Sequence, residues 1–263
     1  MDTLNLSLLQ PDLAWQDAAV NLKHLSTMLE NVSPETNLIV LPEMFTSAFT
    51  MESGAIAENW PGPSLDWMLS IAETHQAAVC GSIAIIDAGK KFNRLVFVTP
   101  ERKVHYYDKR HLFRMLGEHK RYSQGNDRII IQWKGWRILP LVCYDLRFPV
   151  WCRNGADLNY DLILFVANWP AARRQHWRTL LEARAIENLA YAAGVNRIGT
   201  DGNGIDYEGD SLAVSPAGEL LADAENQEGL LETSLSLSEL RKYREAFPAH
   251  LDADSFIISK SQP

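Results

Sequence analysis

One cysteine in this sequence stands where an apolar segment gives way to polar residues. The segment Arg137-Ile-Leu-Pro-Leu-Val-Cys143-Tyr-Asp-Leu-Arg-Phe-Pro149 predicts a strand that ends at Cys143 and a turn into a short helix. A thiol at a strand end is held rigidly, and backbone N–H groups of the turn can face an oxyanion. Most free cysteines are small buried core residues, so position alone leaves both interpretations open. Cys80, inside an apolar run, and Cys152 fit the core interpretation better.

Two further predicted strand ends carry ionisable side chains. Leu38-Ile-Val-Leu-Pro-Glu43 delivers a carboxylate, and Val104-His-Tyr-Tyr-Asp-Lys109 delivers an ammonium group, with Glu118 nine positions later. Taken singly, such charges are more often part of a solvated loop. In α/β sheets, however, ligand crevices lie beyond the carboxyl ends of strands, so these groups could meet Cys143 in one crevice. A thiol, a carboxylate and an ammonium group supply a nucleophile, a general base and an oxyanion clamp.

The segments around these residues resemble the nitrilase superfamily over almost the whole chain. The matching segments are LPEMF around Glu43, YDKRHLF around Lys109, LVCYDLRFP around Cys143, ANWP at 167–170, RAIEN at 184–188 and SPAGE at 215–219. The resemblance implies a Glu43-Lys109-Cys143 triad, with Glu118 as a fourth catalytic member. It also implies an α/β fold, an αββα sandwich with two mixed sheets, and a single carbon-nitrogen hydrolase domain over residues 1–263.

The chain size and the CYDLRFP and DGNG segments look most like the bacterial omega-amidases. Those enzymes hydrolyse the terminal amide of 2-oxoglutaramate or 2-oxosuccinamate, so the resemblance implies a 2-oxo acid monoamide as the small-molecule partner. The alternatives are a deaminated-glutathione amidase, an N-carbamoyl amino acid hydrolase, or a non-catalytic binding protein of the same fold. The joint presence of the three triad residues favours an enzyme.

Such a substrate carries a carboxylate at the end remote from the amide, and arginine is its natural partner. Arg173, just after ANWPA, is the first choice; the alternatives are Arg174, Arg114 and Arg147. Three aromatic residues near the strand ends are predicted to line the substrate pocket, although core packing is an equally common role for such residues. They are Phe45, Tyr144 and Trp169. The backbone N–H of Tyr144 is expected to hold the oxyanion together with Lys109.

Other catalytic arrangements fit the sequence less well. A papain-like pair could use His105, His111 or His119, but the usual cysteine context is missing. A metal site from His111, Glu118 and His119 lacks helical ligand spacing. The glycines of Gly199–Gly204 do not match a dinucleotide fingerprint and predict a turn. We therefore expect neither a metal nor a cofactor.

Strand and helix patterns alternate along the chain and predict mixed sheets covered by helices. The expected strands are Leu4–Leu9, Leu38–Leu41, Ala77–Ile86, Leu162–Ala167, the hairpins Asn93–Val98 with Val104–Tyr107 and Ile129–Trp133 with Trp136–Val142, and the pair Ser211–Val214 with Glu219–Ala222. The expected helices are Asp17–Leu29, one capped by Ser64 and running through His75, Gln175–Ala193 ended by Gly194, and Leu237–Ala246.

Composition narrows the possible partners. The 263 residues contain 25 Lys plus Arg against 33 Asp plus Glu, and the net charge of -8 opposes binding to nucleic acid or anionic lipid. No basic segment precedes a long apolar run, and no run reaches membrane-spanning length, so we expect a cytoplasmic protein without membrane contact. The three cysteines predict free thiols. A homodimer through helices is expected, because the predicted helix around Arg184–Tyr191 carries apolar residues beyond one core stripe and related proteins resemble such dimers.

Overall fold

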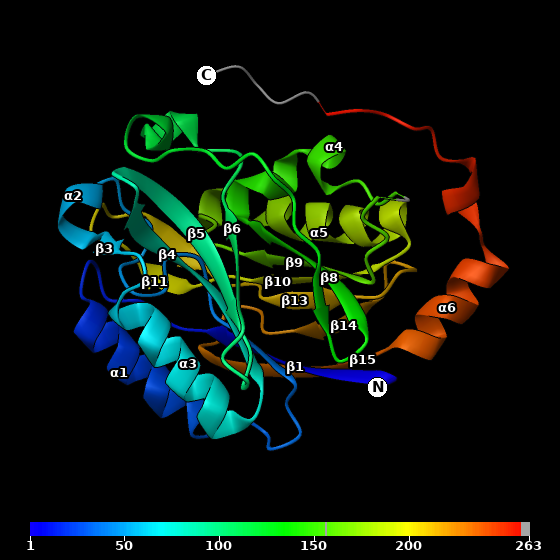
Figure 1. Ribbon diagram of the computed structural model, residues 1–263, viewed down its shortest axis with the longest axis horizontal. Helices are drawn as coiled ribbons and strands as arrows, with labels where there is room; N and C mark the ends of the chain where they lie inside the picture. Colours follow the sequence, from blue (N-terminus) through cyan, green and yellow to red (C-terminus); the bar gives the residue numbers. More distant parts are fainter. Residues whose placement is uncertain (156, 259–263) are drawn as a thin grey trace.

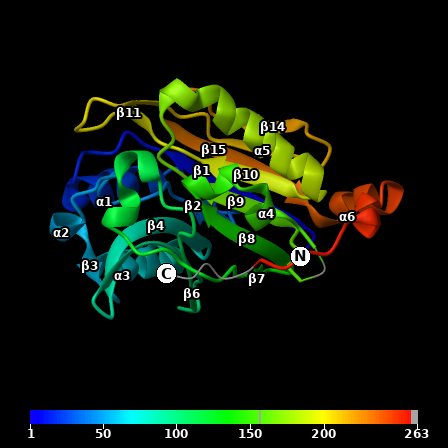
Figure 2. The ribbon, with the colours of Figure 1, turned by 90° about the horizontal axis from the view of Figure 1, so that it is seen from above.

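Two mixed β-sheets pack face to face between outer helices, as the sequence predicts (Figures 1 and 2). The computed structural model describes residues 1–155 and 157–258. The first sheet runs in the order β15 (Gly229–Ser236), β1 (Thr3–Gln10), β2 (Leu38–Val40), β4 (Ala78–Asp87), β5 (Lys90–Val98) and β6 (Val104–Asp108), with β3 (Glu58–Asn59) beside β4. The second runs β14 (Leu220–Asp223), β13 (Leu212–Val214), β10 (Tyr191–Val195), β9 (Leu162–Val166), β8 (Trp136–Val142) and β7 (Ile131–Trp133).

The remaining elements cover the sheets or connect their strands. The hairpin of β11 (Ile198–Thr200) and β12 (Asp206–Glu208) stands apart from both sheets. The α-helices are α1 (Ala18–Leu29), α2 (Ser53–Ile56), α3 (Pro63–His75), α4 (Pro149–Cys152), α5 (Arg174–Asn188) and α6 (Leu237–Ala246). The 3-10 turns are η1 (Arg114–Leu116), η2 (Glu118–Lys120), η3 (Cys143–Arg147), η4 (Ala171–Arg173) and η5 (Ala249–Asp252). No described helix is long and apolar enough to span a bilayer.

Apolar side chains fill the space between the layers. Leu6 and Leu8 of β1 share one buried cluster with Leu139 and Leu164 of the second sheet. Helices α1 and α3 cover the outer face of the first sheet through a second cluster, whereas Trp177 of α5 packs on the second sheet. Figure 2 shows this order, with α5 on one side of the two sheets and α1 and α3 on the other. Strand faces of this kind supply the rigid support that a precise site needs.

Strand direction decides where the candidate side chains emerge. In the first sheet, β1, β2 and β4 are parallel, and two successive antiparallel pairings make β6 parallel to β4 as well. The segments after β2 and β6 therefore leave the same edge, and they carry Glu43 and Lys109. In the second sheet β8, β9 and β10 are parallel, so Cys143 follows β8 at the edge where Asn168 follows β9.

Two sequence predictions about α5 and α3 are wrong. The long helix ends at Asn188, where Leu189 adopts a left-handed conformation with φ of 47°, and not at Ala193. The apolar run after it forms β10, and Gly194 lies inside this strand instead of ending the helix. A glycine is needed at this position because a Cβ there would come within 2.6 Å of Trp177. A fully buried parallel strand has no alternating pattern, so its residues can extend a helical pattern by accident. Helix α3 is capped by Gly62 instead of Ser64.

Strand β15 is absent from the sequence prediction. It pairs antiparallel with the whole of β1 at the edge of the first sheet, and its side chains are mostly half-buried or exposed. The apolar residues that suggested self-association do not all lie on one helix. Tyr191 lies in β10 inside the second sheet, while Ile186 on α5 is half exposed. The homodimer stays a prediction. The free state of the three cysteines is confirmed.

Candidate active site

The carboxylate of Glu43 is fully buried and accepts hydrogen bonds from three parts of the chain. Its Oε1 accepts hydrogen bonds from Lys109 Nζ at 2.8 Å and from Asn93 Nδ2 at 2.7 Å. Its Oε2 accepts the backbone N–H of Asn168 at 2.9 Å. Because a carboxylate oxygen has two lone pairs, Oε1 is saturated while Oε2 keeps one acceptor position. Glu43 is thereby fixed in direction and can still accept one proton.

Lys109 lies between two buried carboxylates. Its Nζ is 2.8 Å from Glu43 Oε1 and 3.0 Å from both oxygens of Glu118, and the Lys109 side chain is only 1% exposed. Burial opposes the charge of the ammonium group, but the negative charges of Glu118 and Glu43 outweigh it and raise the pKa of Lys109. Burial also raises the pKa of Glu118, against the opposing effect of Lys109. The ammonium group is therefore protonated and aimed by both acids.

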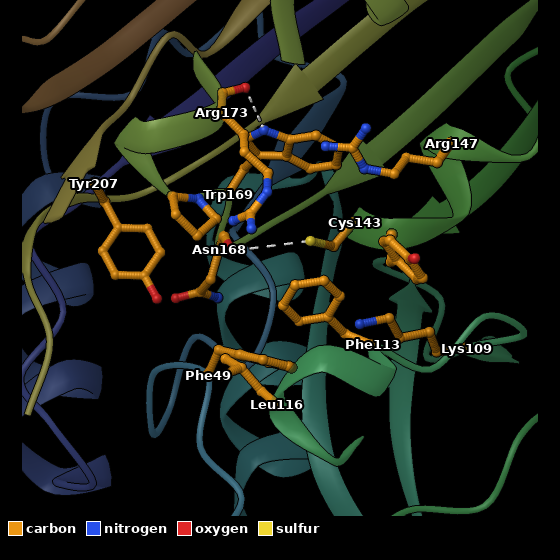
Figure 3. A pocket seen from close by; sticks show the side chains of 12 residues that line it. Phe49, Lys109, Phe113, Leu116, Cys143, Arg147, Asn168, Trp169, Arg173 and Tyr207 are labelled. Atoms are coloured by element: carbon orange, nitrogen blue, oxygen red, sulfur yellow. Dashed lines mark hydrogen bonds between the residues drawn. The ribbon is translucent and has the colours of Figure 1, made fainter. Parts of the chain in front are cut away.

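Cys143 is the first residue of η3 and 9% exposed. Its backbone φ is 44°, a left-handed conformation that is uncommon for a side chain with a Cβ and that recurs at functional sites. Its Sγ lies 3.9 Å from the carbonyl oxygen of Asn168, the contact drawn in Figure 3. Burial raises the pKa of the Cys143 thiol well above its usual range, and the charge of Glu43 adds to this effect. The resting thiol is therefore protonated and needs a base.

The comparisons with known proteins agree with this geometry. The sequence profile of the carbon-nitrogen hydrolase family matches residues 5–245. The chain belongs to that family. The omega-amidase YafV of Escherichia coli K12 is 51% identical over 259 residues, which cover 97% of this chain and 99% of that protein. The 2-oxoglutaramate amidase of Bacillus subtilis is 30% identical, covering 94% of this chain and 96% of that protein.

A solved structure supports the same family fold. The carbon-nitrogen hydrolase superfamily protein of Xanthomonas campestris is 46% identical and superimposes with a TM-score of 0.96, covering 98% of this chain and 100% of that chain. That structure carries an arsenic adduct in its active site. The nitrilase-like αββα sandwich expected from the sequence is thus confirmed for this carbon-nitrogen hydrolase.

A pocket opens beside Cys143 and Lys109, and Figure 3 shows the side chains around it. It is lined by Phe49, Lys109, Phe113, Leu116, Cys143, Tyr144, Arg147, Asn168, Trp169, Pro170, Arg173 and Tyr207. The predicted residues Tyr144, Trp169 and Arg173 thus lie where a substrate bound at Cys143 would extend. Tyr144 follows Cys143 in η3, where the first backbone N–H groups of a turn lack a partner within the turn.

Two of the four candidate arginines reach this pocket. Among the described residues, neither Arg147 nor Arg173 has a carboxylate within ion-pair distance. Arg147 lies 4.7 Å over the ring of Trp169, and Arg173 contacts the sulfur of Met115 at 3.3 Å. Burial lowers the pKa of Arg147, and the charge of Arg173 lowers it further. Two close cations without a described acidic partner form a natural anion site.

The structure places the other two arginines elsewhere. Arg174 forms ion pairs with Asp210 and Glu208 and does not line the pocket. Arg114 lies in the exposed η1 turn and lines a separate cavity with His111. Arg173 and Arg147 are therefore the remaining candidates for a substrate carboxylate.

The prediction that Phe45 lines the pocket is wrong. Phe45 is fully buried on the α3 side of the first sheet, where its ring lies 5.7 Å from that of Trp67. The intervening Met44 has a left-handed φ of 43°, and the two side chains have different surroundings: Phe45 packs in the cluster under α3, whereas Glu43 bonds to Lys109. Phe49, four positions further along, lines the pocket, and the centre of its ring lies 5.0 Å from Lys109 Nζ.

Sequence reasoning missed the two asparagines that hold Glu43. Asn93 is fully buried and also accepts a hydrogen bond from Ser82 Oγ at 2.8 Å, while Asn168 donates from its side chain to the carbonyl oxygen of Glu43. Both carried a signal: each is an uncharged polar residue at the end of an apolar segment, and such a buried group needs partners. Of the competing arrangements, His111 bonds to Asp145 and Glu118 to Lys109, and no hydrogen bond among the described residues joins Cys143 to a histidine.

Proposed function

We propose that this protein is an omega-amidase that hydrolyses the terminal amide of 2-oxoglutaramate or 2-oxosuccinamate, releasing ammonia and the 2-oxo dicarboxylic acid. The observation that carries the proposal is the pocket itself. A buried thiol with an adjacent carboxylate and ammonium group lies at one part of the wall, and Arg147 and Arg173 lie at another. Relatives about half identical over nearly the full length are named omega-amidases, which supports the same substrate class.

In the first half-reaction, Cys143 is the nucleophile and Glu43 the general base. As Sγ attacks the amide carbon, the thiol proton passes to Glu43 Oε2, which has a free acceptor position. The carbonyl oxygen becomes an oxyanion that Lys109 and the backbone N–H of Tyr144 stabilise. Removing one donor of this kind typically lowers the rate by about a hundred- to a thousand-fold. The tetrahedral intermediate then collapses as Glu43 returns the proton to departing ammonia.

In the second half-reaction, water hydrolyses the thioester on Cys143. Glu43 takes a proton from the water, which attacks the thioester carbonyl, and the thiolate leaves and recovers that proton. Such acid–base assistance is typically worth about a hundred- to ten-thousand-fold in rate. One carboxylate thus serves both steps, and its bond to Asn168 N keeps it in place throughout.

Glu118 restrains Lys109. With both its oxygens 3.0 Å from Nζ, Glu118 pulls the ammonium group against its bond to Glu43, and the backbone N–H of Phe113 holds Glu118 in turn. Without this second carboxylate, Lys109 would pair with Glu43 alone and weaken the base. Glu118 therefore keeps the ammonium group available to the oxyanion and Glu43 available to the thiol proton.

The substrate carboxylate pairs with Arg173 and Arg147, while Trp169 and Tyr144 contact the short carbon chain. A guanidinium can bind a carboxylate through two parallel hydrogen bonds, which fixes direction as well as distance. A monoamide of a dicarboxylic acid then presents its amide to Cys143 and its charge to the arginines. A neutral amide would leave the cations unpaired and bind poorly.

Ammonia release with matched amides tests the proposal. We expect the highest kcat/KM with 2-oxoglutaramate or 2-oxosuccinamate, and far lower values with deaminated glutathione and an N-carbamoyl amino acid. A preference for deaminated glutathione or for the carbamoyl compound would replace the proposal with the corresponding hydrolase. No turnover of any of these amides, with unaltered ligand binding by Cys143→Ala, would indicate a binding protein.

We further propose a single carbon-nitrogen hydrolase domain, a cytoplasmic location and a homodimer. The absence of a membrane-spanning helix among the described residues is compatible with the location, and light scattering measures the dimer directly. A monomeric mass at the assay concentration would exclude the dimer as the working form.

A further inference from the structure

The buried carboxylate of Asp145 bonds to both loops that carry the proposed catalytic residues, and neither the mechanism nor the pocket uses it. Asp145 is fully buried in η3, two residues after Cys143. Its Oδ1 accepts the backbone N–H of His111 at 3.0 Å and His111 Nδ1 at 2.7 Å. Its Oδ2 accepts the hydroxyl of Tyr107 at 2.8 Å and the backbone N–H of Val142 at 3.1 Å. All four acceptor positions of the carboxylate are thereby occupied.

Asp145 and the residues that donate to it flank both proposed catalytic residues in the sequence. Tyr107 and His111 stand two residues before and two residues after Lys109, at the end of β6. Val142 and Asp145 stand on either side of Cys143, at the end of β8. The two strands belong to different sheets, so no backbone ladder connects their ends. The carboxylate of Asp145 makes this connection directly.

We propose that Asp145 is a positioning residue that sets the place of Cys143 relative to Lys109. The Val142 N–H bond closes the turn in which Cys143 keeps its left-handed φ of 44°, a conformation that persists only when surrounding contacts enforce it. The bonds to Tyr107 and His111 hold the Lys109 loop against that turn. Because Asp145 acts through these neighbours, it should affect kcat more than KM. The inference rests on the proposed roles of Cys143 and Lys109.

Asparagine cannot replace this carboxylate, although it has nearly the same shape. If its NH2 faces Val142, the N–H of Val142 loses its acceptor. The Tyr107 hydroxyl cannot accept from this NH2 instead, because its oxygen already accepts from Trp151 Nε1 at 2.9 Å and Arg110 N at 3.1 Å. If the amide is flipped, the backbone N–H of His111 faces the NH2 instead. Either orientation leaves one backbone donor unpaired and loosens one of the two loops.

Four variants test the positioning role: Asp145→Asn, Tyr107→Phe, the double variant, and Asp161→Asn as a matched control. Asp161 is another mostly buried carboxylate that accepts a β8 backbone N–H, that of Arg137, but at the opposite end of the strand from Cys143. A loop displaced by about 1 Å can cost about a hundred-fold in rate. We expect Asp145→Asn to lower kcat for 2-oxoglutaramate by about that factor with KM nearly unchanged.

The other three variants test whether the loss of kcat comes from the bonds of Asp145. Tyr107→Phe removes one of the four bonds to Asp145, together with the bonds that the hydroxyl accepts from Trp151 and Arg110, and should lower kcat by about ten-fold. The double variant should be little worse than Asp145→Asn, because both changes break one shared contact. Asp161→Asn should lower the unfolding temperature and leave kcat unchanged. If Asp145→Asn does not fold, Tyr107→Phe alone decides.

Several results would overturn the inference. They are an unchanged kcat in Asp145→Asn or in Tyr107→Phe, losses that multiply in the double variant, or an equal kcat loss in Asp161→Asn. If the wild-type protein hydrolyses no amide, the proposed function fails, and the positioning is then tested by iodoacetamide alkylation of Cys143. Equal alkylation rates in wild type and Asp145→Asn would overturn the positioning role; a changed rate that Asp161→Asn does not share would support it.

Discussion

Replacing Arg173 with methionine should separate anion binding from the chemistry at Cys143. The arginine side chain has no described carboxylate partner, and its observed contacts are the sulfur of Met115 at 3.3 Å and the ring of Phe113 at 5.9 Å. Its charge also disfavours the nearby charge of Arg147. Methionine keeps much of the length of the side chain without the charge. The free protein should therefore unfold at the same temperature as wild type or slightly higher.

The catalytic cost of this change follows from the lost ion pair. A hydrogen bond to a charged group contributes about 1.5–3 kcal/mol, and each 1.4 kcal/mol is about ten-fold in kcat/KM. Arg173→Met should thus lower kcat/KM for 2-oxoglutaramate by about 10- to 150-fold. For pentanamide, which has the same chain length but no carboxylate, kcat/KM should stay at its low wild-type value. Ammonia release measures both.

The adjacent arginine provides a matched control. Arg174 pairs with Asp210 and Glu208 outside the pocket, so Arg174→Met should leave kcat/KM unchanged for both amides and lower stability slightly. An equal loss on 2-oxoglutaramate and pentanamide in Arg173→Met would refute the reasoning, because it would mean that Arg173 supports the catalytic geometry and not the substrate charge. No loss on either amide would remove Arg173 from the carboxylate site.

Three further changes probe other parts of the account. Burial and the charge of Glu43 raise the pKa of the Cys143 thiol, so the rate of its alkylation should still be rising with pH at pH 9. Glu43→Gln removes that charge and should shift the rise to lower pH. A plateau of the wild-type rate below pH 8 would contradict this. Glu118→Gln should lower kcat by about a hundred-fold or more by releasing Lys109 toward Glu43, and a wild-type kcat would exclude the restraint. Phe45→Ala should destabilise the fold by about 3–5 kcal/mol in denaturant titrations while the folded fraction keeps its kcat/KM; a selective loss of activity would return Phe45 to the pocket.

The ends of regular strands are the most predictable part of this molecule. The strands predicted to stop before Glu43, Lys109 and Cys143 do end there, at Val40, Asp108 and Val142, and ligand crevices of α/β sheets lie beyond such strand ends. The family resemblance combines these three residues, and the structure places Lys109 within hydrogen-bond distance of Glu43. The sequence also predicts helix α6 with its observed bounds, since the polar pattern of this segment is a local feature; the structure adds Ser236 as its N-cap.

Features that depend on contacts between distant segments are less predictable. The residues of β10 follow α5 directly, and pairing with the distant strands β9 and β13, together with the fit of Gly194 under Trp177, makes this segment extended. Phe45 and Phe49 both follow the strand end at Glu43, and the path of the chain through the left-handed Met44 and Ala48 puts Phe45 in the core and Phe49 at the pocket. Such turns are set by tertiary packing, which local sequence patterns do not encode.

The buried polar partners escape prediction for a related reason. Asn93, Asn168 and Asp145 reveal their roles only when their hydrogen-bond partners are known, because these bonds join residues far apart in sequence. Each is nevertheless a polar residue next to or inside an apolar segment. Since buried polar groups need partners, polar residues at such positions in a sequence are candidates for supports of a site.

Mass spectrometry of the protein quenched during turnover of 2-oxoglutaramate tests the central claim most directly. We predict that Cys143 alone gains the mass of the substrate less ammonia, that Cys80 and Cys152 stay unmodified in their buried positions, and that Cys143→Ala shows neither adduct nor ammonia release. Ammonia release by Cys143→Ala at the wild-type rate, or an acyl adduct on another residue, would contradict the proposed mechanism.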